Sequence, residues 1–105
     1  MRALPHPATE DLQLTEVLRA LSDPVRLDLV TRLAGGEEMP CMAMASDIDV
    51  HKSTLSHHYK TLREAGVTHT TVDGRQRFIR LRRADLDARF PGLLDSVLLA
   101  AAAVT

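Results

Sequence analysis

The sequence predicts a mainly α-helical domain that carries a single β-hairpin. Leucine and alanine make up more than a quarter of the 105 residues and only three residues are aromatic, a balance that favours helix over sheet. Apolar residues recur at helical spacing over most of the chain, whereas one stretch alternates with a period of two on either side of an Asp-Gly turn. Residues 10–105 are expected to form a single domain behind a flexible N-terminal arm at residues 1–9.

Two helices are predicted in the first third of the chain. The first is expected to begin near Thr9 or Glu10, because apolar side chains follow at positions that share one helix face. Asp23 and Pro24 are typical N-cap and first-turn residues, so a second helix is expected to start there and to end at the Gly-Gly pair after residue 34. The apolar stripe of the first helix consists of Leu14, Val17, Leu18 and Leu21.

A short helix and a longer one are predicted next. Pro40 is expected to open the short helix, which holds residues 42–45 and gives way to a tight turn at residues 46–49. The longer helix is expected over residues 52–65, with Gly66 as its stop. Its apolar stripe contains Leu55, Tyr59 and Leu62, with His58 beside it as a packing residue, and its polar face gathers Ser53, Ser56, His57, Lys60 and Glu64.

A β-hairpin and a final helix complete the predicted fold. Residues 67–72 and 75–82 alternate as strands do, and Asp73-Gly74 between them is a strong two-residue turn signal. The final helix is expected to follow Pro91 and to run to Val104. Its stripe carries almost no charge and should be covered by another surface; it consists of Leu94, Val97, Leu98 and Ala101.

The net charge of -1 hides a basic segment. Residues 51–83 contain eight Lys and Arg against two acidic residues, a formal charge of +6, whereas the rest of the chain carries -7. Such a cluster is typical of a surface that meets phosphates. The polar-faced helix and the hairpin together predict double-stranded DNA as a partner, with the helix in the major groove and the hairpin on the neighbouring backbone. The candidate DNA contacts are Lys52, Ser53, Thr54, Ser56, His57, Lys60, Arg75 and Arg77.

The runs Ala20–Leu27 and Ser53–Gly66 resemble those of the ArsR/SmtB family of bacterial winged-helix repressors. The resemblance rests above all on the Ser-His-His sequence of the polar-faced helix and on the Leu-Arg-Glu-Ala-Gly pattern after it. It implies a winged helix-turn-helix fold, a homodimer built from the first and last helices, and a repressor that leaves its operator, expected to be palindromic, when an effector binds. The expected dimer-interface residues are Leu14, Val17, Leu18, Leu94, Val97, Leu98 and Ala101.

The effector sites best known in that family are missing from this sequence. A Cys-x-Cys pair in the third helix would fall at Pro40 and Met42, and a site on the last helix needs histidines, but no histidine follows His69. The remaining candidate ligands for a divalent metal effector such as nickel, cobalt or zinc are His6, Glu10 and Asp11, completed across the dimer by Asp85, Asp87 or Asp95. The competing interpretation is a mobile arm with ordinary surface carboxylates.

Sulfur-containing residues cluster around the single cysteine. Their thiol and thioether groups are ligands that soft metal ions prefer, but methionine at helical spacing is usually part of a core. A redox role for the thiol would need a bridge between subunits or a small-thiol adduct, because the chain holds no second cysteine. These residues are Met39, Cys41, Met42 and Met44.

Other classes of function are less compatible with the sequence. It lacks a nucleophile elbow, a phosphate-binding glycine loop and a His-Glu-x-x-His motif, so we expect no enzyme. A winged-helix protein-interaction module, or a regulator that depends on a partner and has no effector site of its own, stays open. Low cysteine content and the lack of a long apolar run predict a cytoplasmic protein with no membrane contact.

Overall fold

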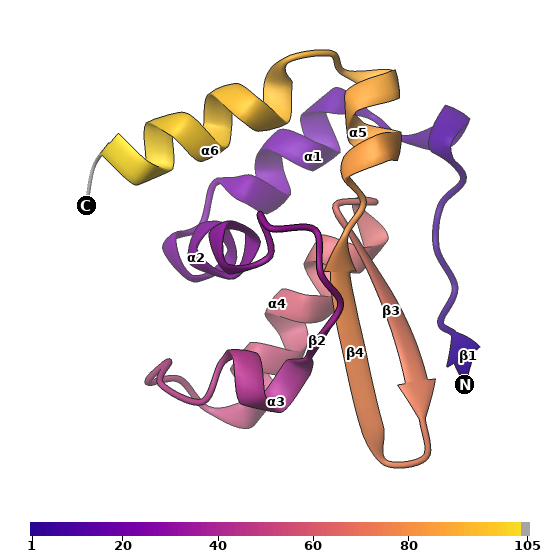
Figure 1. The fold of residues 1–105 in the computed structure, drawn as a ribbon, viewed down its shortest axis with the longest axis vertical. Coiled ribbons are helices and arrows are strands. Elements are labelled where there is room, and N and C mark those ends of the chain that lie inside the picture. Colours follow the sequence, from indigo (N-terminus) through magenta and orange to yellow (C-terminus); the bar gives the residue numbers. More distant parts are fainter. Residues whose placement is uncertain (104–105) are drawn as a thin grey trace.

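Figure 1 shows the fold of the computed structural model, which describes residues 1–103. The helices are α1 (Leu14–Leu21), α2 (Pro24–Arg32), α3 (Cys41–Met44), α4 (Lys52–Glu64), α5 (Arg83–Arg89) and α6 (Leu93–Ala103). The strands are β1 (Arg2–Ala3), β2 (Met39–Pro40), β3 (Thr68–Asp73) and β4 (Gln76–Leu81). The predicted combination of a mainly helical fold with a β-hairpin is confirmed. Val104, the expected last residue of the final helix, lies outside the described residues.

The core lies between the helices and one face of an antiparallel sheet whose strands follow the order β1-β3-β4-β2. α1, α2 and α4 contact one another, α6 packs against α2 and α5, and α4 also contacts β3. On α4, Leu62 is buried in this core, and Leu55 and Tyr59 pack against it. The largest fully buried apolar side chains are those of Leu12, Val17, Leu29, Val30, Leu33, Leu62, Val67, Ile79, Leu86 and Leu94.

The first α-helix begins later than the sequence suggests. A short 3-10 turn covers Thr9–Asp11, and α1 starts only at Leu14. Between them Leu12 adopts an extended conformation with φ -66° and ψ 132°, and its side chain is buried. The break has a physical reason: burying Leu12 against the end of α4 requires the backbone to leave the helical path.

Residues 1–9 do not form the expected free arm. β1 pairs with β3, so that Arg2 lies opposite Val72 and Ala3 opposite Thr71. The backbone N–H of Leu4 then donates to the carbonyl oxygen of Thr70 at 3.0 Å. The N-terminal segment is therefore the outer strand of the sheet beside the hairpin, as Figure 1 shows.

Side chains hold this N-terminal segment in place. The His6 ring stacks on the His69 ring with centroids 4.3 Å apart and an interplanar angle of 7°, and His6 Nε2 accepts a hydrogen bond from the Thr70 N–H at 2.9 Å. Burial, then the neighbouring His69 and Arg82, lower the pKa of His6 to about 4. His6 is therefore neutral near pH 7 and keeps the lone pair that accepts this bond. Arg82 Nη1 also donates to the carbonyl oxygen of Pro7 at 2.8 Å.

Two further elements were not anticipated from the sequence. β2 pairs with β4, and Pro40 is its last residue and the N-cap of α3. α5 fills the stretch between the hairpin and the final helix. Its start is fixed by Asp85, whose carboxylate accepts hydrogen bonds from Arg82 at 2.9 Å and from Thr9 at 2.8 Å. These two bonds connect α5 to the N-terminal segment.

Gly66, just after α4, packs closely against Leu12, which lies just before α1. Its φ is +85°, in the left-handed region, and a methyl group added there would collide with the side chain of Leu12. Gly36 has a similar φ of +82° but open space around it, and Gly35 has neither constraint. Substitutions at these three glycines therefore distinguish the cost of a steric clash from the cost of backbone strain.

We expect Gly66→Ala to lower the free energy of unfolding by about 2–5 kcal/mol, because strain and overpacking add. Gly36→Ala should cost about 1–2 kcal/mol from strain alone, and Gly35→Ala should be close to neutral. Denaturant unfolding of all three variants at one protein concentration measures these differences. A loss at Gly66 no larger than that at Gly36 would contradict the packing argument.

Candidate nucleic-acid interface

The helix α4 presents a polar face to solvent. His58 and Leu62 are buried on its inner side, whereas all six residues predicted from this helix to contact DNA are exposed. These are Lys52, Ser53, Thr54, Ser56, His57 and Lys60. Their small hydroxyl, imidazole and ammonium groups can reach base edges and phosphates without distortion of the helix.

A cluster around Arg26 fixes α4 relative to α1 and α2. Asp23 caps α2 by accepting from the Arg26 backbone N–H at 3.0 Å, and that bond lowers the pKa of the Asp23 carboxyl. The Arg26 side chain donates from Nε to the carbonyl oxygen of Ala20 at 2.7 Å and from Nη1 to His58 Nδ1 at 3.1 Å. Because a guanidinium only donates, His58 Nδ1 is the acceptor. His58 is thus the packing residue that the sequence predicts.

Two more contacts set the position of α3 against α4 and α2. The Tyr59 hydroxyl donates to the carbonyl oxygen of Cys41 at 2.7 Å. Arg32 bridges Asp28 and Asp47 and also donates to the carbonyl oxygen of Met44 at 3.0 Å. The angle between α3 and α4 therefore depends on directional hydrogen bonds in addition to apolar packing.

The β3–β4 hairpin projects beyond the helical body (Figure 1). Its turn places Gly74 at φ +62°, and Arg75 and Arg77 just past the turn are exposed, as predicted for DNA contacts. Arg80, which lies on the Phe78 face of β4, is also exposed and sits opposite His69. A polar helix face and a basic hairpin thus protrude from one domain, which is the geometry of a winged helix-turn-helix.

Known proteins share both this sequence and this fold. Residues 21–71 match a family model described as a helix-turn-helix domain. The chain is 34% identical over 90 residues to the uncharacterized HTH-type transcriptional regulator YceK of Bacillus subtilis, covering 85% of this chain and 90% of that protein. It is 33% identical to the arsenical resistance operon repressor of Staphylococcus aureus, covering 71% of each. The crystal structure of the transcriptional repressor BigR from Xylella fastidiosa superposes with a TM-score of 0.64 at 31% identity, covering 83% of this chain and 84% of that one.

The chain belongs to the ArsR-type winged helix-turn-helix transcriptional regulators. The predicted family, fold and DNA-binding regulatory class are confirmed. The family consists of transcriptional regulators, in agreement with the expectation that the chain is not an enzyme. Among residues 1–103 of this ArsR-type regulator, no helix has the length and apolarity needed to span a membrane.

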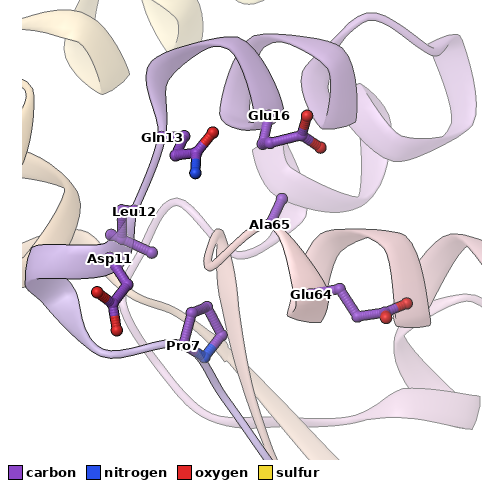
Figure 2. A pocket seen from close by; sticks show the side chains of 7 residues that line it. All are labelled: Pro7, Asp11, Leu12, Gln13, Glu16, Glu64 and Ala65. Carbon is purple, nitrogen blue, oxygen red and sulfur yellow. The ribbon is translucent and has the colours of Figure 1, made fainter.

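The predicted metal ligands of this ArsR-type regulator are not brought together. His6 Nε2 already accepts the Thr70 N–H, and residues 1–103 contain no group of three or more His, Cys, Asp or Glu side chains placed to hold a metal ion. Figure 2 shows Asp11 with Glu16 and Glu64 around a pocket of about 130 Å³ between the start of α1 and the end of α4. Neither His6 nor Glu10 lines that pocket. Within one chain, His6, Glu10 and Asp11 therefore do not form a metal site among the described residues, and a site completed across the dimer stays a prediction.

The predicted dimer residues divide into two groups. Val17 and Leu94 are buried in the core of the single chain, so their assignment to a dimer interface is wrong. Leu14 and Leu18 are 45% and 43% exposed. Leu99, which lies outside the apolar stripe predicted for the last helix, is 74% exposed. The remaining predicted residues, Val97, Leu98 and Ala101, are partly buried.

The sulfur-containing residues are mainly core residues. Cys41 and Met44 are buried, Met39 packs against the core, and Met42 is 70% exposed on α3. They do not converge into a metal site among the described residues. Burial raises the pKa of the Cys41 thiol from 9.0 to about 11, with a smaller opposing effect of Arg77.

We expect Cys41 to be a poorly reactive thiol. With a pKa of about 11, only about one thiol in ten thousand is ionised at pH 7. The rate of alkylation by iodoacetamide should therefore rise about tenfold per pH unit up to the highest pH at which the protein stays folded. In denaturant the same cysteine should react as an ordinary thiol. A rate that levels off below pH 9 in the folded protein would show that the thiol is not suppressed.

Proposed function

We propose that this ArsR-type regulator is a cytoplasmic repressor that binds a palindromic operator as a homodimer. The observation that carries the proposal is the exposed polar face of α4 beside the basic tip of the β3–β4 hairpin. Several relatives are named as repressors, among them the biofilm growth-associated repressor of Xylella fastidiosa, which is 35% identical.

The proposed contacts follow from side-chain chemistry and position. Ser56 and His57, on the exposed face of α4, read base edges in the major groove. The exposed cationic residues neutralise backbone phosphates, and the first-turn hydroxyls help to fix the register. The phosphate contacts are Lys52, Lys60, Arg75 and Arg77, and the first-turn residues are Ser53 and Thr54.

Dimerisation in this proposal uses the exposed apolar side chains of α1 and α6. Leu14, Leu18 and Leu99 are exposed apolar side chains, and a second copy related by a two-fold axis would cover them. Two α4 helices would then enter successive major grooves, which predicts half-sites about one helical turn, or a small multiple of a turn, apart.

Release by an effector requires a site whose affinity differs between the DNA-bound and free forms of the dimer. The α1–α6 surface is where such a difference in affinity would arise, because in the proposed dimer it joins the two DNA-binding units. A cysteine-pair site in the third helix is not part of the proposal, since Pro40 and Met42 occupy the matching positions.

DNA binding should depend steeply on salt and on the basic residues. Lys60→Ala and Arg75→Ala should each reduce the slope of log K against log salt by about 0.9 for every chain bound. Ser56→Ala and His57→Ala should leave the slope intact but reduce discrimination between operator and unrelated DNA by about 1–3 kcal/mol. Fluorescence anisotropy with the DNA upstream of the gene, and with an unrelated duplex, measures both effects.

Arg83→Gln is the matched control, because it also removes one positive charge but lies on α5, at the other end of the hairpin from its turn (Figure 1). If wild-type protein binds neither duplex, the interaction-module interpretation replaces the repressor. If all four test variants behave like Arg83→Gln, the reading face has been assigned to the wrong residues.

The dimer surface can be tested by placing a carboxylate on it. Leu99→Glu and Leu18→Glu should give monomers at micromolar concentration, because burying an unpaired carboxylate between subunits costs on the order of several kcal/mol. Met42→Glu is the control, since Met42 is exposed to about the same degree as Leu99 but lies on α3. Analytical ultracentrifugation distinguishes the species. Dimers that persist in both test variants would refute this interface.

A further inference from the structure

The N-terminal strand brings a basic side chain into line with the hairpin. Arg2 lies opposite Val72 on β3, and Val72 lies opposite Arg77 on β4. Directly opposed residues of antiparallel strands project from the same face of a sheet. Arg2, Val72 and Arg77 therefore form one row across three strands, with an arginine at each end.

This row continues the buried face of the sheet toward the hairpin turn. Thr70 and Ile79, one step along the same face, are buried under the helical body. Arg2 and Arg77 belong to that face nearer the hairpin turn, and both are exposed, although Arg77 lies close enough to α3 to influence the Cys41 thiol. Neighbouring strands are about 4.8 Å apart, so the two arginines are separated by about 10 Å. They can thus meet different phosphates of one DNA backbone.

The charge of Arg2 is available for such a contact. Among residues 1–103, no carboxylate lies within 4.0 Å of the Arg2 guanidinium, whereas Arg32, Arg82 and Arg83 are each paired with aspartates. Asp73, the acidic residue of the hairpin turn, is one position along β3 from Val72 and so belongs to the opposite face. The row itself contains no acidic residue.

The backbone that carries Arg2 is fixed by the residues that follow it. Leu4 donates to the Thr70 carbonyl, His6 Nε2 accepts from the Thr70 N–H, and the His6 ring stacks on His69. The carbonyl oxygen of Pro7 is held by Arg82. An arginine on a strand held this way loses less backbone entropy on binding than one on a free arm.

We propose that β1 is a third strand of the wing, that Arg2 binds a DNA backbone phosphate next to the phosphate bound by Arg77, and that His6 is the positioning residue that keeps β1 docked. This inference rests on the proposed function, because it assumes that the hairpin meets DNA. It enlarges the DNA-binding surface beyond the residues predicted from the sequence.

The test measures the salt dependence of DNA binding by the full chain. Arg2→Gln removes the charge and keeps a long side chain, and it should lower the slope of log K against log salt by about 0.9 for every chain bound. The loss should be the same on operator and unrelated DNA, since a phosphate contact carries no sequence information. Arg83→Gln, again the matched control, should leave the slope unchanged.

His6 variants test the positioning role. His6→Ala should lower the slope as much as Arg2→Gln does, and the double variant should show no further loss, because both changes remove the same contact. His6→Gln, whose amide oxygen can accept the Thr70 N–H, should restore most of the slope. Circular dichroism and sedimentation should show that every variant keeps the fold and the oligomeric state of wild type.

The outcomes separate this inference from the proposed function. If wild type binds no DNA, the proposed function fails and this inference fails with it. If wild type binds and Arg75→Ala lowers the slope, but Arg2→Gln behaves like Arg83→Gln, the third strand is not part of the interface and the proposed function stands. If Arg2→Gln lowers the slope and His6→Ala does not, His6 is not the positioning residue.

Discussion

The guanidinium of Arg26 is the contact on which the arrangement of the helices depends. It donates to the last carbonyls of α1, at Ala20 and at Arg19, and to the imidazole of His58 in the middle of α4. The end of a helix carries unpaired carbonyls and a partial negative charge, so a cation there satisfies both. One side chain thus joins the end of α1, the start of α2 and the centre of α4.

This contact explains why His58 and His57 have different roles although they are adjacent. His58 is buried and its Nδ1 is committed to Arg26, which fixes the rotation of α4 about its own axis. His57, about 100° further round the helix, is left on the exposed face. The buried contact of His58 therefore sets the direction in which the polar side of α4 faces. The hydrogen bonds from Tyr59 and Arg32 hold α3 in place beside it.

Features with a local cause could be predicted from the sequence. The two faces of α4 follow from its periodicity, and the hairpin follows from Asp73-Gly74 and the alternation around it. Features with a distant cause could not. The docking of residues 1–9 depends on His69 and Arg82, more than sixty positions away in the chain, and the late start of α1 depends on the space that Gly66 leaves for Leu12.

The candidate interfaces show the same limit. An apolar stripe indicates that a helix face is covered, but it does not show which surface covers it. The sequence therefore predicts a partner subunit over Val17 and Leu94, whereas the chain's own core covers them. Leu99 lies outside the stripe and only the three-dimensional arrangement reveals its exposure. The hydrogen bond between His6 and the backbone of β3 could not be predicted for a similar reason, because its partner Thr70 lies 64 positions away in the chain.

The two edge strands of the sheet limit how copies of this protein can associate. Both outer strands, β1 and β2, are only two residues long, and a proline lies two residues after β1, at Pro5, and at the end of β2, at Pro40. Short edges interrupted by proline offer few free backbone groups to a neighbouring molecule. Such edges disfavour edge-to-edge aggregation while the hairpin extends into solvent, which is compatible with the proposed self-association through α1 and α6.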